Sequence, residues 1–118
     1  MPVAHVVTFT FKSNTPPESI AELSAALDEL ASETAALSYR HGADLNIRPG
    51  NADYSVTAVF EDEAAFNTYI SSERHVQILH GLIEPLGENR SAVQFATTPY
   101  SFGHRIAYGP ARPRALLD

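Results

Sequence analysis

Apolar residues in this chain repeat with two different periods, and the order of those periods restricts the fold more than any other feature. Across residues 3–11 every second side chain is apolar or aromatic except His5, which is the period of a β-strand with one buried face. Across residues 20–37 the large apolar side chains recur every three or four positions, which predicts a long amphipathic helix. Thr15 is expected to cap this helix, with Glu18 completing a capping box.

The remaining expected elements are, in chain order, a strand at 37–47, a turn at 48–53, a strand at 54–60, a short helix capped by Asp62, a polar break at 71–74, a second helix to about Pro85 and a strand at 91–97. This order predicts a ferredoxin-like βαββαβ fold of the α+β class, in which a four-stranded antiparallel sheet carries its helices on one face. The other face of the sheet stays bare, so we expect a homodimer that covers it.

Length and composition narrow the functional classes. The chain has 118 residues, and we expect one domain at 1–97 followed by an irregular C-terminal arm at 98–118. The net charge of −6 argues against a nucleic-acid partner, and no apolar run approaches the roughly 20 residues that span a membrane. The absence of cysteine and an N-terminus that starts directly with a strand pattern favour a cytoplasmic location.

The segment 60–79 carries the residues best suited to chemistry. Tyr69 follows Phe66 by three positions, so both rings are expected to face inward. His75 lies just after the polar break, near a helix N-terminus, where the helix dipole favours the neutral imidazole that a general base requires. His5 alternates with apolar neighbours on the first strand, so its ring is expected to point inward, either as a buried hydrogen-bonded side chain or as a pocket residue.

The other histidines are assigned less specific roles. His41 shares a face with Tyr39 and is expected to reach either the interior or the dimer interface, with interface packing favoured. His80 is expected to lie on the apolar side of its helix as a core residue. Nothing distinguishes His104. A metal site is disfavoured because the inward histidines come from different elements, with no fixed spacing and no obvious carboxylate partner.

Four stretches of the sequence carry a resemblance to a known family: HVVTFTFK from His5, YRHGADL from Tyr39, YSVTAVFEDEAAF from Tyr54 and YISSERHV from Tyr69. Through them, residues 2–97 resemble the stress-responsive α/β-barrel domain (Dabb) family. The resemblance implies a small dimeric ferredoxin-like protein, in which two chains together form an α/β barrel.

Within that family the chain is similar to plant polyketide cyclases, which close linear poly-β-keto chains by aldol condensation without metal or organic cofactor. By position, this resemblance implies that His75 is the base, Tyr69 the assisting phenol and His5 a residue that lines the pocket. Tyr54 stands where the cyclase has a histidine, and this difference affects the expected identity of the substrate more than that of the base. The resemblance to these cyclases implies that no cofactor is needed. Haem-degrading relatives depend on a tryptophan, which this chain lacks, so haem is not expected.

We therefore expect a cofactor-independent cyclase or lyase that acts on a polyketide-like or phenolic small molecule, with His75 as general base and Tyr69 assisting. The residues expected to bind the substrate are His5, Val7, Phe9, Tyr54, Phe66 and Leu79. Two alternatives stay open. One is a non-catalytic, stress-responsive dimer that binds a small hydrophobic ligand, and the other is a cofactor-free monooxygenase of the same fold.

Overall fold

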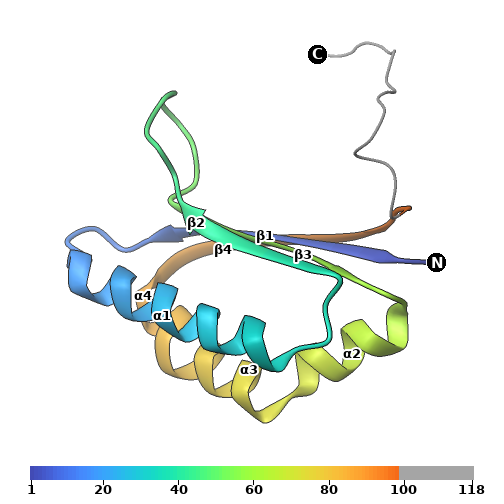
Figure 1. Ribbon diagram of the computed structural model, residues 1–118. Helices are drawn as coiled ribbons and strands as arrows, with labels where there is room; N and C mark the ends of the chain where they lie inside the picture. Colours follow the sequence, from blue (N-terminus) through green and yellow to red (C-terminus); the bar gives the residue numbers. More distant parts are fainter. Residues whose placement is uncertain (99–118) are drawn as a thin grey trace.

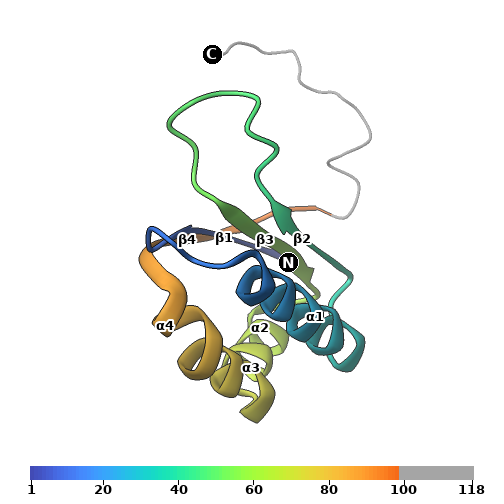
Figure 2. The ribbon, with the colours of Figure 1, turned by 90° about the vertical axis from the view of Figure 1, so that its left-hand side faces the viewer.

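The computed structural model describes residues 1–98. Its elements are, in order, β1 (Val3–Phe11), α1 (Pro17–Glu33), β2 (Ser38–Ala43), β3 (Tyr54–Phe60), α2 (Glu63–Ser71), α3 (Glu73–Ile78), the π-helical turn η1 (Leu79–Ile83), α4 (Glu84–Leu86) and β4 (Gly87–Ala96). The strands form one antiparallel sheet in the order β2-β3-β1-β4, and all helices lie on one face of it (Figures 1 and 2). The expected ferredoxin-like α+β fold is confirmed. The sheet of the single chain is open and is not closed into a barrel.

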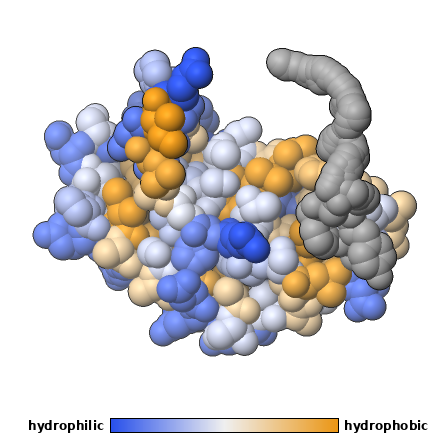
Figure 3. Space-filling view, turned by 45° about the horizontal axis from the view of Figure 1, so that its top comes forward, coloured by the Kyte–Doolittle hydropathy of each residue, from blue (hydrophilic) through white to orange (hydrophobic). Residues whose placement is uncertain are grey.

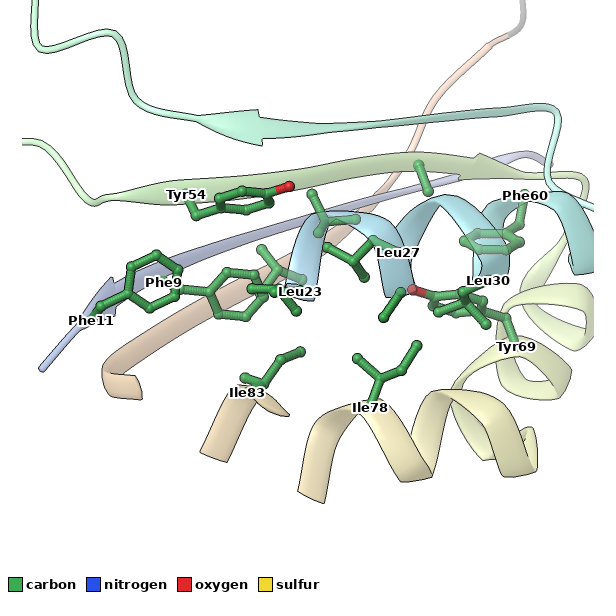
Figure 4. Packing of buried hydrophobic residues seen from close by; sticks show 14 residues of the cluster. Phe9, Phe11, Leu23, Leu27, Leu30, Tyr54, Phe60, Tyr69, Ile78 and Ile83 are labelled. Carbon is green, nitrogen blue, oxygen red and sulfur yellow. The ribbon is translucent and has the colours of Figure 1, made fainter. Parts of the chain in front are cut away.

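The hydrophobic core fills the space between the sheet and the helices (Figure 4). The inward face predicted for β1 is confirmed, because Phe9 is 3% exposed and both His5 and Val7 are buried. On α1 the buried side chains are spaced by three and four residues, as the helical period requires. The largest contributors to the core are Phe9, Phe11, Leu23, Leu27, Leu30, Tyr54, Phe60, Tyr69, Ile78 and Ile83.

The start of α1 differs from the expected capping box. Pro16 occupies the N-cap position, and no side chain there accepts a hydrogen bond from the helix. The hydroxyl of Thr15 instead donates to the Lys12 carbonyl at 2.6 Å, which closes the preceding turn. The fixed φ of proline, with Pro17 in the first turn, suits the start of a helix without help from a threonine cap.

The second strand is shorter than expected, because β2 ends at Ala43 and not at residue 47. Asn46 has a positive φ of 59°, and its backbone N–H donates to the Asp44 carboxylate at 2.9 Å. This local turn removes the chain from the ladder, so residues 44–53 form a loop that projects beyond the sheet (Figure 1). Leu45 and Ile47, which the alternating pattern placed in the strand, are 80% and 75% exposed on that loop.

The helical segment after β3 confirms the predicted cap and break. The Asp62 side chain accepts from the Ala65 backbone N–H at 2.8 Å, and Ser72 has an extended backbone between α2 and α3. The predicted continuous second helix is divided, however, by the π-helical turn η1. Pro85 lacks an N–H and would crowd the carbonyl four residues earlier in a regular helix, which accounts for a wider turn before it.

The last strand begins at Gly87, four residues before the expected start, and continues to Ala96. It forms the sheet edge beside β1, with a register shift at Thr10 and Phe11. The arm expected at 98–118 lies outside the described residues except for its first position. Within residues 1–98, no helix combines the length and the hydropathy needed to cross a membrane.

Candidate active site

A cavity of about 240 Å³ lies between the sheet and the helices. It brings together the three polar residues that the sequence singled out, because His5 enters from β1, Tyr69 from α2 and His75 from α3. Of the other residues expected to contact substrate, Val7, Phe9 and Leu79 also line it. The remaining lining residues are Leu27, Leu30, Val56, Ile70, Ile78, Ile83, Arg90, Ala92 and Gln94.

His5 is held as a neutral ring. Its side chain is buried, its Nδ1 lies 2.9 Å from the Gln94 amide nitrogen, and its ring centroid is 4.9 Å from that of Phe66. Burial lowers the pKa of His5 to about 4, and the nearby charge of His75 acts in the same direction. Because the Gln94 amide donates to Nδ1, the ring proton lies on Nε2.

His75 is placed by the break between α2 and α3. The hydroxyl of Ser72 accepts a hydrogen bond from the His75 backbone N–H at 3.2 Å, which fixes the residue in the first turn of α3. The ring centroid lies 4.8 Å from that of Tyr69 in an edge-to-face contact. The buried Nδ1 atom has no hydrogen-bond partner among the described residues.

Several groups act on the basicity of His75. Burial lowers its pKa most, and the positive charge of Arg90 lowers it further, whereas the backbone carbonyl of Ile70 acts to raise it. The net effect is a pKa below the ordinary value of 6.5. The imidazole is therefore neutral at pH 7, and one ring nitrogen keeps a lone pair that can accept a proton.

Tyr69 is buried, and its hydroxyl lies 2.8 Å from the hydroxyl of Tyr39 on β2. Burial raises the pKa of Tyr69, and the hydrogen bond from Tyr39 acts in the opposite direction. The phenol is therefore protonated at neutral pH. When Tyr39 donates to Tyr69, the proton of Tyr69 is available to an acceptor in the cavity.

Two residues expected to bind substrate lie outside the cavity lining. Phe66 packs against the His5 ring and supports it from α2. Tyr54 is 3% exposed, and its hydroxyl lies 2.7 Å from Nδ1 of His41. Nε2 of His41 in turn lies 2.7 Å from the Asp28 carboxylate on α1. Tyr54 is thus tied to a carboxylate–imidazole–phenol chain beside the core.

The other histidines differ from their sequence-based assignments. The His41 ring turns toward α1, with only 10% of its side chain exposed, so it takes the interior position and not the interface packing that was favoured. His80 was expected in the core, but its side chain is 62% exposed and its Nδ1 contacts the Glu84 carboxylate at 2.9 Å. No group of three or more His, Asp or Glu residues within 1–98 is arranged to hold a metal ion.

Sequence reasoning missed the contribution of β4 to the cavity. Arg90, Ala92 and Gln94 alternate along the strand, so their side chains share one face. Because the strand was expected to begin only at residue 91, Arg90 fell outside it. Residues 87–90 carry no alternating apolar pattern, so the start of β4 at Gly87 follows from its pairing with β1 and not from a local signal.

The βαββαβ order and the open antiparallel sheet, with an apolar cavity between sheet and helices, define a ferredoxin-like α+β domain. The model of the stress responsive A/B barrel domain, Dabb, matches residues 3–97. The chain therefore belongs to the Dabb family. A comparison with curated proteins finds no match.

Solved structures show the same fold. A protein from Thermobifida fusca, described as dimeric, ferredoxin-like and of unknown function, is 31% identical, with a TM-score of 0.77 over 82% of this chain and 92% of that chain. A Dabb protein from Mesorhizobium loti is 17% identical, with a TM-score of 0.70 over 82% and 97%. A hydroxynitrile lyase from Passiflora edulis is also 17% identical, with a TM-score of 0.72 over 83% and 94%.

Proposed function

We propose that this protein is a cofactor-independent lyase or cyclase that makes or breaks a carbon–carbon bond beside a carbonyl group in a polyketide-like or phenolic small molecule. The observation that carries the proposal is the meeting of neutral His75 and protonated Tyr69 in one apolar cavity. A base and a hydrogen-bond donor are the two groups that enolate chemistry requires.

In the ring-closing direction, His75 removes a proton from the carbon between two carbonyl groups. The electron pair of the broken C–H bond moves onto a carbonyl oxygen, and the Tyr69 hydroxyl donates a hydrogen bond to that enolate oxygen. The enolate carbon then bonds to the carbon of a second carbonyl, whose oxygen becomes an alkoxide. Protonated His75 returns its proton to this oxygen, so the base is regenerated.

The size of the cavity favours a compact substrate. Its volume of about 240 Å³ lies just below the range of about 300–1,000 Å³ typical of ligand pockets, which suits a molecule of one ring. One structural neighbour is a hydroxynitrile lyase. The fold thus carries lyase chemistry in another protein, and at 17% identity that likeness concerns the fold alone.

A second candidate is a non-catalytic dimer that binds a small hydrophobic ligand. The backbone carbonyl of Ile70, which acts to raise the pKa of His75, favours it, because an imidazole beside a backbone acceptor can be a purely structural group. Two observations favour catalysis. The cavity is accessible, and the Tyr69 hydroxyl is bonded to Tyr39 and not to His75. The third reading, a cofactor-free monooxygenase, would consume oxygen with a phenolic substrate.

The experiment that tests the proposal is turnover of a panel of β-keto thioesters and single-ring β-dicarbonyl compounds. His75→Ala should lower kcat by about 10²–10⁴-fold, the usual contribution of a general base. Tyr69→Phe should lower it by about 10²–10³-fold, as expected for one donor to an oxyanion. His80→Ala is the matched control, because this imidazole is exposed and outside the cavity lining.

Two outcomes would overturn the catalytic proposal. One is equal turnover by wild type and His75→Ala, and the other is no turnover by wild type across the whole panel. Binding of panel compounds without turnover would favour the ligand-binding dimer. Oxygen uptake that requires His75 would favour the monooxygenase.

The assembly that we propose is a homodimer through the helix-free face of the sheet. Val93 and Phe95 on that face are 53% and 51% exposed in the single chain. The neighbour from Thermobifida fusca is described as dimeric. We propose further that residues 1–97 form the domain that dimerises, that 98–118 form an arm, and that the protein works in the cytoplasm.

A further inference from the structure

We propose that the substrate carries a carboxylate, and that Arg90 on β4 binds it at the edge of the cavity. This inference rests on the proposed function for the role of the cavity and adds a charge requirement to the class of substrate. It concerns a residue that the sequence reasoning had not connected to the site.

The register of the sheet places Arg90 at one end of the cavity. On β4, Gln94 pairs with His5 and Arg90 pairs with Phe9, four residues further along β1. At about 3.3 Å per residue, the two pairs are separated by about 13 Å along the strands. The cavity therefore has an end at His5 and Gln94 and another at Arg90 and Phe9, with apolar side chains between them.

The charge of Arg90 has no counterpart in the cavity. Among its described lining residues, none is an aspartate or a glutamate. The ion pairs of residues 1–98 join other side chains, and Glu84 pairs with His80. Glu84 and Glu88 border a neighbouring depression that Arg90 also lines, but neither lies within ion-pair distance of the guanidinium.

A carboxylate is the ligand that suits this arrangement. A guanidinium presents paired N–H donors that match the two oxygens of a carboxylate, and apolar walls on one side strengthen the interaction relative to open water. A cavity of this volume leaves room for one ring together with such a group, whereas a bulky phosphorylated carrier exceeds it.

Binding of an anion would also act on the base. The charge of Arg90 lowers the pKa of His75, so a carboxylate paired with Arg90 offsets that charge and makes the imidazole more basic. The other titratable groups lining the cavity are His5 and Tyr69, both neutral at pH 7. A carboxylated substrate thus strengthens the base that acts on it.

The test compares benzoate with benzamide, its neutral counterpart of nearly equal size, by calorimetry and by NMR titration of the His75 ring. Wild type should bind benzoate about tenfold more tightly than benzamide, since a charge-assisted hydrogen bond contributes at that level. Benzoate should raise the pKa of His75, and benzamide should leave it unchanged. The preference should weaken in high salt.

Arg90→Gln is the decisive variant, because its exposed side chain can be replaced without opening the core. It should lose the preference for benzoate and the shift of His75, while still binding benzamide. Arg74→Gln is the matched control, because Arg74 pairs with Glu29 on the outside of the helices. It should behave as wild type.

Equal binding of the two probes by wild type, no binding of either, or an unchanged preference in Arg90→Gln would each overturn the inference. These measurements do not depend on turnover. If carboxylate selectivity holds while no β-keto compound is turned over, the anion site stands and the catalytic proposal fails. If turnover is found but neutral substrates are preferred, the anion site fails alone.

Discussion

At the scale of single residues, the burial of His5 makes the stability of the domain depend on pH. The unfolded chain begins to bind a proton on this ring near its ordinary pKa of 6.5, whereas the folded chain does so only near a pKa of about 4. Between these values the unfolded state binds more protons, so the free energy of unfolding falls as the pH decreases from 6.5 to 4. The stabilisation is fully present above 6.5.

His5→Gln should reduce this dependence on pH. Each unit of pKa difference corresponds to about 1.4 kcal/mol, so we expect His5 to account for about 1–3 kcal/mol of the loss, after allowing for solvent access. Urea unfolding at several pH values measures this loss of unfolding free energy. The matched control is His80→Gln, which replaces an exposed histidine outside the core and should leave the contribution of His5 in place. Identical slopes for wild type and His5→Gln would contradict the prediction.

The sequence located individual side chains where a local period determined their direction. The alternation of β1 placed His5 inward, and the spacing of Phe66 and Tyr69 placed the phenol on the inner side of α2. The Tyr39–Tyr69 bond joins β2 to α2, and the His41–Tyr54 bond joins β2 to β3, so no pattern within one element indicated them. Turn chemistry at Asp44 and Asn46 overrode the alternation that had extended β2.

At the scale of elements, Ser72 connects α2 to α3 and thereby positions His75. Its extended backbone ends α2 and begins α3, and its hydroxyl accepts from the His75 N–H. Ser72→Ala removes the cap, so we expect the free energy of unfolding to fall by about 1 kcal/mol. The looser first turn of α3 should also lower kcat on any substrate that depends on His75.

Ser71→Ala is the control for Ser72→Ala. The Ser71 hydroxyl donates to the Asn67 carbonyl within α2, so its loss should change stability by less than about 0.5 kcal/mol. Thermal unfolding and turnover should be measured on both variants. A Ser72→Ala protein as stable and as active as Ser71→Ala would show that the cap has no role in placing the base.

The helical segment shows which boundaries a sequence can indicate. Only a polar break was predicted at 71–74, without Ser72 as a cap, whereas the Asp62 cap was predicted because a capping residue acts within three positions of itself. The π-helical turn before Pro85 was not predicted, because a helical period continues through it with only a small phase change. The early start of β4 at Gly87 follows from pairing with β1 across the sheet, which the residues at 87–90 do not specify alone.

At the scale of the whole molecule, one face of β4 lines the cavity and the other lies on the helix-free side of the sheet. Arg90 and Gln94 line the cavity, while Val93 and Phe95 lie on the opposite side of the strand. The register places Phe95 beside Ala4 and Val93 beside Val6, which gathers apolar residues on the helix-free face. Figure 3, an oblique view onto this face, shows apolar patches on it and on the projecting loop.

The proposed dimer can be tested by introducing a single charged side chain on this face. Phe95→Glu places a carboxylate in the apolar centre of the proposed interface, which should weaken association by about 2 kcal/mol or more, over tenfold in Kd. Gln77→Glu adds the same group to an exposed position on α3 and should leave the dimer intact. Sedimentation at several concentrations measures both, with circular dichroism to confirm folding.

Dissociation of the proposed dimer should also affect the cavity, because β4, which carries Arg90 and Gln94, has its other face in the proposed interface. An edge strand without its partner has lost the contacts that hold one of its faces, so the cavity wall becomes less well ordered. We therefore expect Phe95→Glu to weaken benzoate binding although Phe95 does not line the cavity. A monomeric wild type, or full benzoate affinity in a monomeric Phe95→Glu variant, would show that ligand binding in the cavity does not depend on dimerisation.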